Sequence, residues 1–180
     1  MRRTWAALPV LAAVLVSTAP ASAAAHTSPP PSTSLSTGSG WEPAPQAPFD
    51  AAAGVRCDFP VHGEPVVDEV VQRVLDTYPD GTPKRVEYKG DLIVRVTNTD
   101  TGAFYDADAG GRAVVDHRAD GSELWSVVGP VLFGFAENGG TLARGLYIVD
   151  GVYTMDISAT RYKTLTMLHG TADPLCARID

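Results

Sequence analysis

The segment LYIVDGVYTMDIS, residues Leu146 to Ser158, decides the fold class of this chain. β-Branched and aromatic residues flank Asp150-Gly151 on both sides, and such residues favour strands. Asp-Gly is typical of a two-residue hairpin turn. The segment therefore predicts two short antiparallel strands, 146–149 and 152–158, joined by a hairpin at Asp150-Gly151.

The same pattern recurs along most of the chain. Short runs rich in β-branched and aromatic residues alternate with turn residues. The further runs are 85–89, 92–98, 103–106, 113–118, 123–128, 131–135 and 164–169, and the turns between them include Gly90-Asp91, Thr101-Gly102, Gly110-Gly111, Asp120-Gly121, Gly129-Pro130 and Asn138-Gly139-Gly140. Turns spaced about ten residues apart predict an all-β domain. We expect a single antiparallel β-barrel of about eight short strands, with a β-sandwich as the alternative.

One segment, residues 66–76, gives conflicting signals. Its apolar residues recur at helical spacing, but almost all of them are valines, which prefer strands. The turn Tyr78-Pro79-Asp80-Gly81 that follows suits a hairpin. We expect a strand here, and a short helix covering a barrel end is the alternative.

The N-terminal residues have the pattern of a secretory signal. Arg2 and Arg3 precede an apolar run from 5 to 16, and Ala21-Ser22-Ala23 is a typical cleavage site. The run is shorter than the roughly 20 apolar residues that span a bilayer. We expect a signal peptide at 1–23, a secreted extracellular protein, and no stable membrane insertion after cleavage.

Two composition changes divide the remaining chain. Residues 24–53 are rich in Pro, Ser, Thr and Ala, which predicts a disordered spacer, and 54–180 form the β domain. The only cysteines, Cys57 and Cys176, lie near the two ends of that domain. In an exported chain without a CxxC motif, they predict one structural disulfide bond.

The order of several short motifs resembles a family of secreted actinobacterial proteins of unknown function. The motifs include Cys57-Asp-Phe-Pro-Val61, Tyr78-Pro-Asp-Gly81, Val96-Thr-Asn98 and Cys176, and they cover nearly the whole domain. The resemblance implies a terminal cysteine pair and an antiparallel barrel related in shape to calycins or allene oxide cyclases. It implies no catalytic residue. The valine-rich stretch after His62 departs from the family pattern.

Charge and motifs exclude several functions. The formal net charge of −7 argues against nucleic acids and anionic membranes as partners. The sequence contains no GxSxG motif and no phosphate-binding glycine loop. His62, His117 and His169 lack the local spacing of metal ligands, so we expect no cofactor and no metal site.

The remaining signals favour binding. Trp125, Phe133 and Tyr147 are the candidate ligand-binding residues, because ligand pockets are mostly apolar. We expect a non-catalytic binding module for a small apolar ligand or an extracellular partner that the sequence does not identify. A cyclase-like or isomerase-like enzyme is one alternative, since a carboxylate such as Asp116, Glu123 or Asp156 could project into the cavity. A secreted protein inhibitor is the other.

Overall fold

The computed structural model describes residues 40–180, and the expected signal peptide at 1–23 and the first part of the expected spacer lie outside them. Apart from one short 3-10 helix, all regular structure in this range is β-strand, which confirms the all-β fold. The elements are β1 (Glu42–Pro43), β2 (Phe49–Ala51), β3 (Val61–Asp68), β4 (Val71–Thr77), β5 (Pro83–Lys89), β6 (Leu92–Asn98), β7 (Phe104–Asp108), β8 (Arg112–His117), β9 (Glu123–Val128), β10 (Val131–Phe135), β11 (Gly145–Ile157), β12 (Lys163–Pro174) and the 3-10 helix η1 (Cys176–Arg178). The valine-rich segment 66–76 forms parts of β3 and β4, so the strand expectation is confirmed there.

The ordered domain begins earlier than the sequence predicts. Residues 40–53 belong to the expected spacer, but β1 pairs with β4 and β2 pairs with β3. Phe49 packs closely on Gly63, where a Cβ would lie 2.2 Å from the Phe49 ring. The Trp41 ring lies 4.6 Å from the guanidinium carbon of Arg73 and 4.2 Å from the Lys89 ammonium. Backbone pairing and these two aromatic contacts order a segment whose composition alone predicts disorder.

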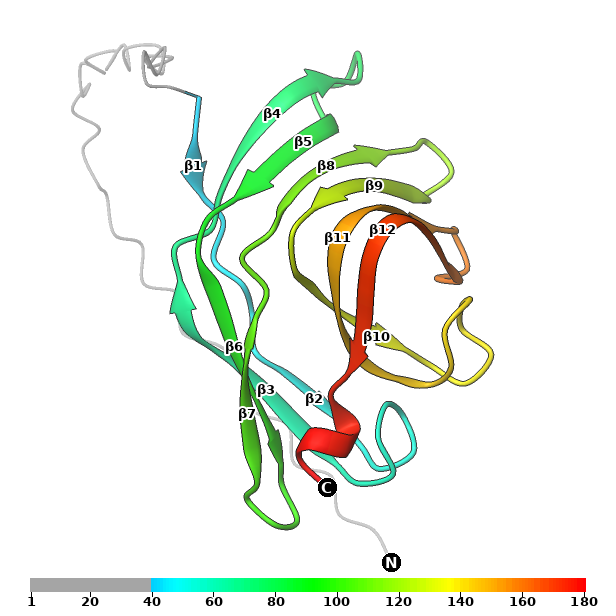
Figure 1. Ribbon diagram of the computed structural model, residues 1–180. Helices are drawn as coiled ribbons and strands as arrows, with labels where there is room; N and C mark the ends of the chain where they lie inside the picture. Colours follow the sequence, from blue (N-terminus) through cyan, green and yellow to red (C-terminus); the bar gives the residue numbers. More distant parts are fainter. Residues whose placement is uncertain (1–39) are drawn as a thin grey trace, which may run out of the picture. The chain divides into compact units, whose positions relative to one another are not determined.

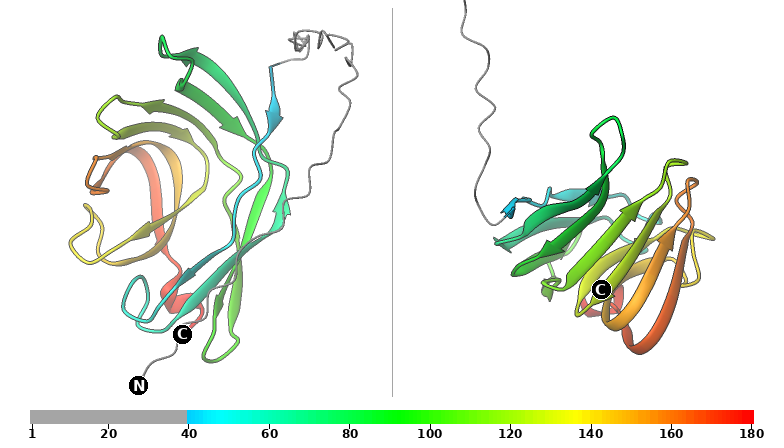
Figure 2. Two further views of the ribbon diagram at one scale, coloured as in Figure 1. Left: turned by 180° about the vertical axis from the view of Figure 1, so that it is seen from behind. Right: turned by 90° about the horizontal axis from the view of Figure 1, so that it is seen from above.

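The strands form two antiparallel sheets and not a closed barrel (Figure 1). The larger sheet has eight strands in the order β1-β4-β5-β8-β9-β11-β10, with β12 paired to the free side of β11. The smaller sheet has the order β2-β3-β6-β7. No pairing among residues 40–180 closes either sheet on itself, so the expected barrel is wrong in this respect. The larger sheet is strongly curved (Figure 2), and the smaller one packs against part of it.

The predicted hairpin at Asp150-Gly151 is also wrong, because β11 runs straight through it. Val128 pairs with Val152, and Val131 pairs with Val149, which is the same register continued. Strands β9 and β10 are therefore two halves of one long strand that bends at Gly129-Pro130. The pairs β3–β4, β5–β6 and β7–β8 continue each other in the same way across short breaks.

A line of glycines marks where these long strands bend. Backbone contacts join neighbouring members across the strands: Gly129 N donates to Gly151 O at 2.8 Å, and Gly111 N donates to Pro130 O at 2.7 Å. At Gly151 (φ 132°) a Cβ would lie 2.1 Å from the carbonyl oxygen of His169, so a side chain is excluded there. We call this set the glycine line; its members are Gly90, Gly111, Gly129, Gly151 and Gly170.

The two sheets arise at the glycine line. On one side of it β8 pairs with β9, whereas on the other side the continuing strands β7 and β10 are not paired with each other. The sheet therefore forks, and two core clusters result. One cluster lies in the fork between the sheets and includes Val61 and Val96 of the smaller sheet and Leu146 of the larger one. The other lies on the concave face of the larger sheet and includes Val115, Phe135 and Met155. This face-to-face packing is closer to the sandwich alternative than to a barrel.

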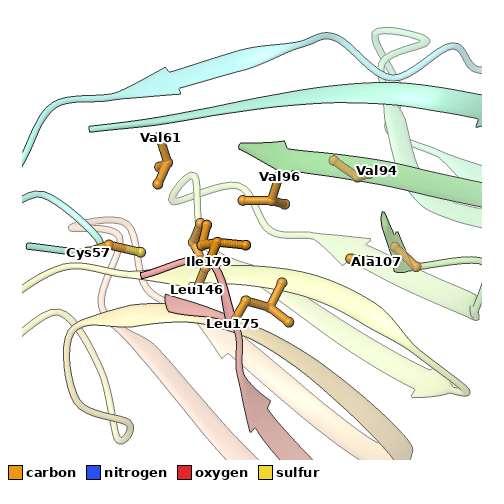
Figure 3. Packing of buried hydrophobic residues seen from close by; sticks show 9 residues of the cluster. Cys57, Val61, Val94, Val96, Ala107, Leu146, Leu175 and Ile179 are labelled. Atoms are coloured by element: carbon orange, nitrogen blue, oxygen red, sulfur yellow. The ribbon is translucent and has the colours of Figure 1, made fainter. Parts of the chain in front are cut away.

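The chain's C-terminus closes the first cluster. Leu175 and Ile179 are almost fully buried among strands of both sheets (Figure 3). Buried Asn98 donates from Nδ2 to the Ile179 carbonyl at 3.0 Å. Cys57 and Cys176 form a disulfide bond with a Cα–Cα distance of 5.5 Å, as expected. None of the elements in residues 40–180 is a helix long and apolar enough to cross a bilayer.

Candidate functional site

A cleft of about 510 Å³ lies between the two sheets along β10, and side chains from both faces of that strand line it. Its volume is within the range of about 300–1,000 Å³ that is usual for small-molecule sites. The floor is mostly apolar and comes from β2, β6, β9, β10 and β11: Phe49, Leu92, Val94, Trp125, Val131, Leu132, Phe133 and Leu146. Five ionisable side chains join this floor: Asp50, Arg56, Glu123, Arg161 and Lys163.

Two of the three predicted ligand-binding residues meet in this cleft. Trp125 of β9 and Phe133 of β10 pack edge to face, with ring centroids 5.8 Å apart. They share a face because β9 and β10 continue one register, so residues an even number apart point the same way. Phe133 is buried and rests on Tyr153, whereas Trp125 is half-buried and accessible from the cleft.

Tyr147 is not among the residues that line the cleft. Its ring packs edge to face on Phe135, with centroids 5.7 Å apart. Its hydroxyl donates to the carbonyl of Ala143 at 3.2 Å. The structure therefore gives Tyr147 a packing role beside the second core cluster.

Of the three candidate acids, Glu123 lines the cleft. The indole Nε1 of Trp125 donates to Glu123 Oε2 at 2.9 Å. Arg161 Nη1 and His117 Nδ1 lie 3.7 and 3.8 Å from Glu123 Oε1. Glu123 is thus held by a neutral donor, with an arginine and a histidine nearby.

The other two candidate acids lie outside the cleft. Asp116 pairs with Arg85 at 2.7 Å, and Asp156 pairs with Arg118 at 2.8 Å. Along their strands, both alternate with the apolar residues of the second core cluster, so their side chains lie on the opposite face of the sheet. Of the three acids, only Glu123 is placed to meet a ligand.

Sequence reasoning missed the cations of the cleft, Arg56 and Lys163. Burial of Lys163, together with the charges of Arg56 and Arg161, lowers the pKa of its ammonium below the ordinary value. The sequence could have indicated the direction of Lys163, because Lys163, Leu165 and Met167 occupy every second position of β12 and share one face. Leu165 and Met167 pack on the core, so Lys163 points to the same side. Arg56 lies in a loop, where alternation gives no direction.

A buried carboxylate elsewhere has a structural role. Glu87 of β5 is 3% exposed and accepts hydrogen bonds from Arg112 Nε and Arg73 Nε, each at 2.6 Å. The Arg112 and Arg73 guanidinium groups hold the pKa of the Glu87 carboxyl below its usual range, against the opposing effect of burial. Glu87 does not line the cleft, so we assign this triad to stability.

The other chemical candidates do not assemble. No three His, Cys, Asp or Glu side chains between residues 40 and 180 come together as a metal site. His62 instead lies 2.8 Å from Asp50.

Comparison of the chain with protein-family models, with curated proteins and with solved structures finds no match. The fold and the cleft thus define the protein only by class: an all-β, disulfide-bonded domain of two antiparallel sheets with an apolar-floored cleft. The resemblance to secreted actinobacterial proteins rests on the short motifs alone.

Proposed function

We propose that this protein is a secreted, non-catalytic binding module that holds a small apolar ligand in the cleft. The observation that carries the proposal is the pairing of Trp125 and Phe133 on an aliphatic floor in a cleft of about 510 Å³. Ligand sites are typically concave and apolar with a few placed polar groups. The disulfide bond suits an oxidising extracellular compartment.

Trp125 is the residue whose removal is most informative. Its ring is only half-buried, so part of its apolar surface is left for a ligand to cover. Covering about 50–80 Å² of that surface would contribute roughly 1–2 kcal/mol at about 25 cal/mol per Å². This corresponds to a loss of about tenfold in affinity for Trp125→Ala.

The test uses an uncharged apolar dye, N-phenyl-1-naphthylamine, titrated into the purified protein. We expect dye fluorescence to rise to a one-to-one endpoint, and Trp125→Ala to weaken binding about tenfold. Phe104→Ala is the matched control, because Phe104 is an exposed aromatic residue outside the cleft. Absence of dye binding, or equal weakening by both variants, would overturn the proposal.

A second candidate, an isomerase-like enzyme, is favoured by one observation. Glu123 is a carboxylate oriented by the Trp125 indole at the cleft, which is the arrangement that a general base requires. Ligand extracted from protein purified out of its own culture medium decides between the two candidates. If wild-type protein converts that ligand to an isomer of equal mass and Glu123→Gln does not, the enzyme reading is correct. If both leave it unchanged, binding is the function.

A further inference from the structure

Two cations in the cleft wall, Arg56 and Lys163, have no acidic partner among residues 40–180. Arg56 is half-buried, and its only described side-chain hydrogen bond is Nη1 to the neighbouring Val55 carbonyl at 3.1 Å. Lys163 is also half-buried; its ammonium lies 5.8 Å from the centroid of the Phe135 ring and forms no ion pair within residues 40–180. Both side chains line the same cleft.

The acids that line the cleft are already engaged. Glu123 is held by the Trp125 indole and faces Arg161. Asp50 points largely into solvent and contacts His62 at 2.8 Å. Three cations and two acids line the cleft, and two of these cations, Arg56 and Lys163, form no ion pair with either acid, although the chain as a whole carries a net charge of −7.

The backbone makes room for one of these cations. A Cβ at Gly134 of β10 would lie 2.5 Å from Arg56 Nε, so the guanidinium occupies space that any other residue would fill. Gly134 also lines the cleft. Arg56 is thus seated against the β10 backbone, beside the apolar floor.

Half-buried cations without an ion-pair partner lose hydration and gain no interaction in return. An anion bound between them would supply charge-assisted hydrogen bonds that compensate for this loss. Burial and the neighbouring charges of Arg56 and Arg161 already disfavour the charged form of Lys163, which lowers its pKa. The negative charge of a bound carboxylate would favour the charged form of Lys163 and so oppose this lowering.

We propose that the ligand of this cleft is an amphipathic anion: an apolar chain on the floor of Trp125 and Phe133, with a carboxylate headgroup held by Arg56 and Lys163. This inference rests on the proposed binding function and specifies the ligand class. The carboxylate is the part of the ligand that sets its orientation, because the floor alone offers no fixed polar contact.

The experiment compares ligands of equal chain length for displacement of N-phenyl-1-naphthylamine from the full chain. The ligands are dodecanoate, dodecan-1-ol and dodecyltrimethylammonium. We expect dodecanoate to bind about tenfold tighter than dodecan-1-ol, since a charge-assisted hydrogen bond contributes that much. Dodecyltrimethylammonium should bind most weakly. Equal binding of dodecanoate and dodecan-1-ol overturns the inference.

Variants identify the cations. Arg56→Met and Lys163→Met should each remove most of the advantage of dodecanoate, whereas Lys89→Met should not. Lys89 is a suitable control because it contacts Trp41 outside the cleft. If a variant fails to fold, the pH series on the wild-type protein decides: dodecanoate affinity should fall as Lys163 deprotonates, at a lower pH than for an ordinary lysine, while dodecan-1-ol affinity stays constant. A dodecanoate affinity that does not change with pH over that range counts against the inference.

The two proposals fail in different ways. If the neutral dye does not bind at all, the binding function is wrong. If the dye binds normally and the headgroup has no effect, the binding function stands and only the anionic ligand class is wrong.

Discussion

Loss of the Cys57–Cys176 disulfide should destabilise the domain by several kcal/mol. The bond joins residues separated by 119 positions, which spans nearly all of the described domain. In the chain-entropy treatment, opening a loop of that length costs about 4.9 kcal/mol at 25 °C. For a domain of this size, that loss lowers the melting temperature by about 15–20 °C.

The loss of covalent constraint must be separated from the loss of packing. Cys57 is 2% exposed in the first core cluster, so Cys57→Ala also removes buried sulfur. Reduction of the wild-type protein keeps both side chains in place. We therefore compare thermal unfolding of the oxidised protein, the reduced protein and the Cys57→Ala/Cys176→Ala double variant.

The entropic explanation predicts similar melting temperatures for the reduced protein and the double variant, both far below that of the oxidised protein. It also predicts a larger denaturant m-value without the bond, because an uncrosslinked unfolded chain exposes more surface. If the fully reduced protein melts within about 3 °C of the oxidised form, less than 1 kcal/mol is involved and the reasoning is refuted.

Three further predictions concern the glycine line, the buried carboxylate and the chain start. Gly151→Ala should lower the free energy of unfolding in urea by at least about 3 kcal/mol, since its Cβ would meet the His169 carbonyl. Gly102→Ala, at φ 77° with open space around it, should lower it by only about 1–2 kcal/mol. Equal losses in the two variants would contradict the steric explanation. Glu87→Gln should lower stability by about 1–3 kcal/mol at neutral pH. Because folding lowers the pKa of Glu87 from 4.5, the extra stability of the wild-type protein over Glu87→Gln is complete above pH 4.5 and disappears as the pH falls through the folded pKa. Acid titration of both proteins, followed by circular dichroism, measures this change. A stability difference that stays constant with pH would argue against the explanation. Secreted protein should begin near Ala24 by N-terminal sequencing, and recovery of intact Met1 from membranes would contradict the signal peptide.

The sequence predicts strands far better than it predicts how they join. Thr101-Gly102 and Asp120-Gly121 are true chain reversals, as expected. Gly129-Pro130 and Asp150-Gly151 have similar local chemistry but lie within long bent strands. A glycine with positive φ serves both purposes, and only the pairing partner across the sheet distinguishes them. That information is not local, so short-range patterns overestimate the number of hairpins and predict a barrel of short strands.

Alternation along a strand accounts for the placement of two of the candidate site residues. Trp125 and Phe133 share a strand face through the bend, so their meeting in the cleft follows from even spacing. Tyr147 pairs with Phe133 across β10 and β11 and lies on the same face, but its ring packs on Phe135 and does not line the cleft. Arg56 enters the cleft from a loop and is seated against Gly134, a contact that no sequence spacing encodes.

The glycine line also has a consequence for how the strands find their partners during folding. When one strand of an antiparallel sheet slips by a single residue, its inward and outward side chains exchange faces. The loss of apolar burial is normally the main penalty for such a slip. Here a slip would also bring a Cβ to a crossing where Gly151 and Gly170 leave no room for one. The long strands that contain a member of the glycine line thus have a fixed register at their bend as well as at their turns. We expect these backbone contacts to disfavour misaligned strand pairs in addition to the effect of side-chain packing.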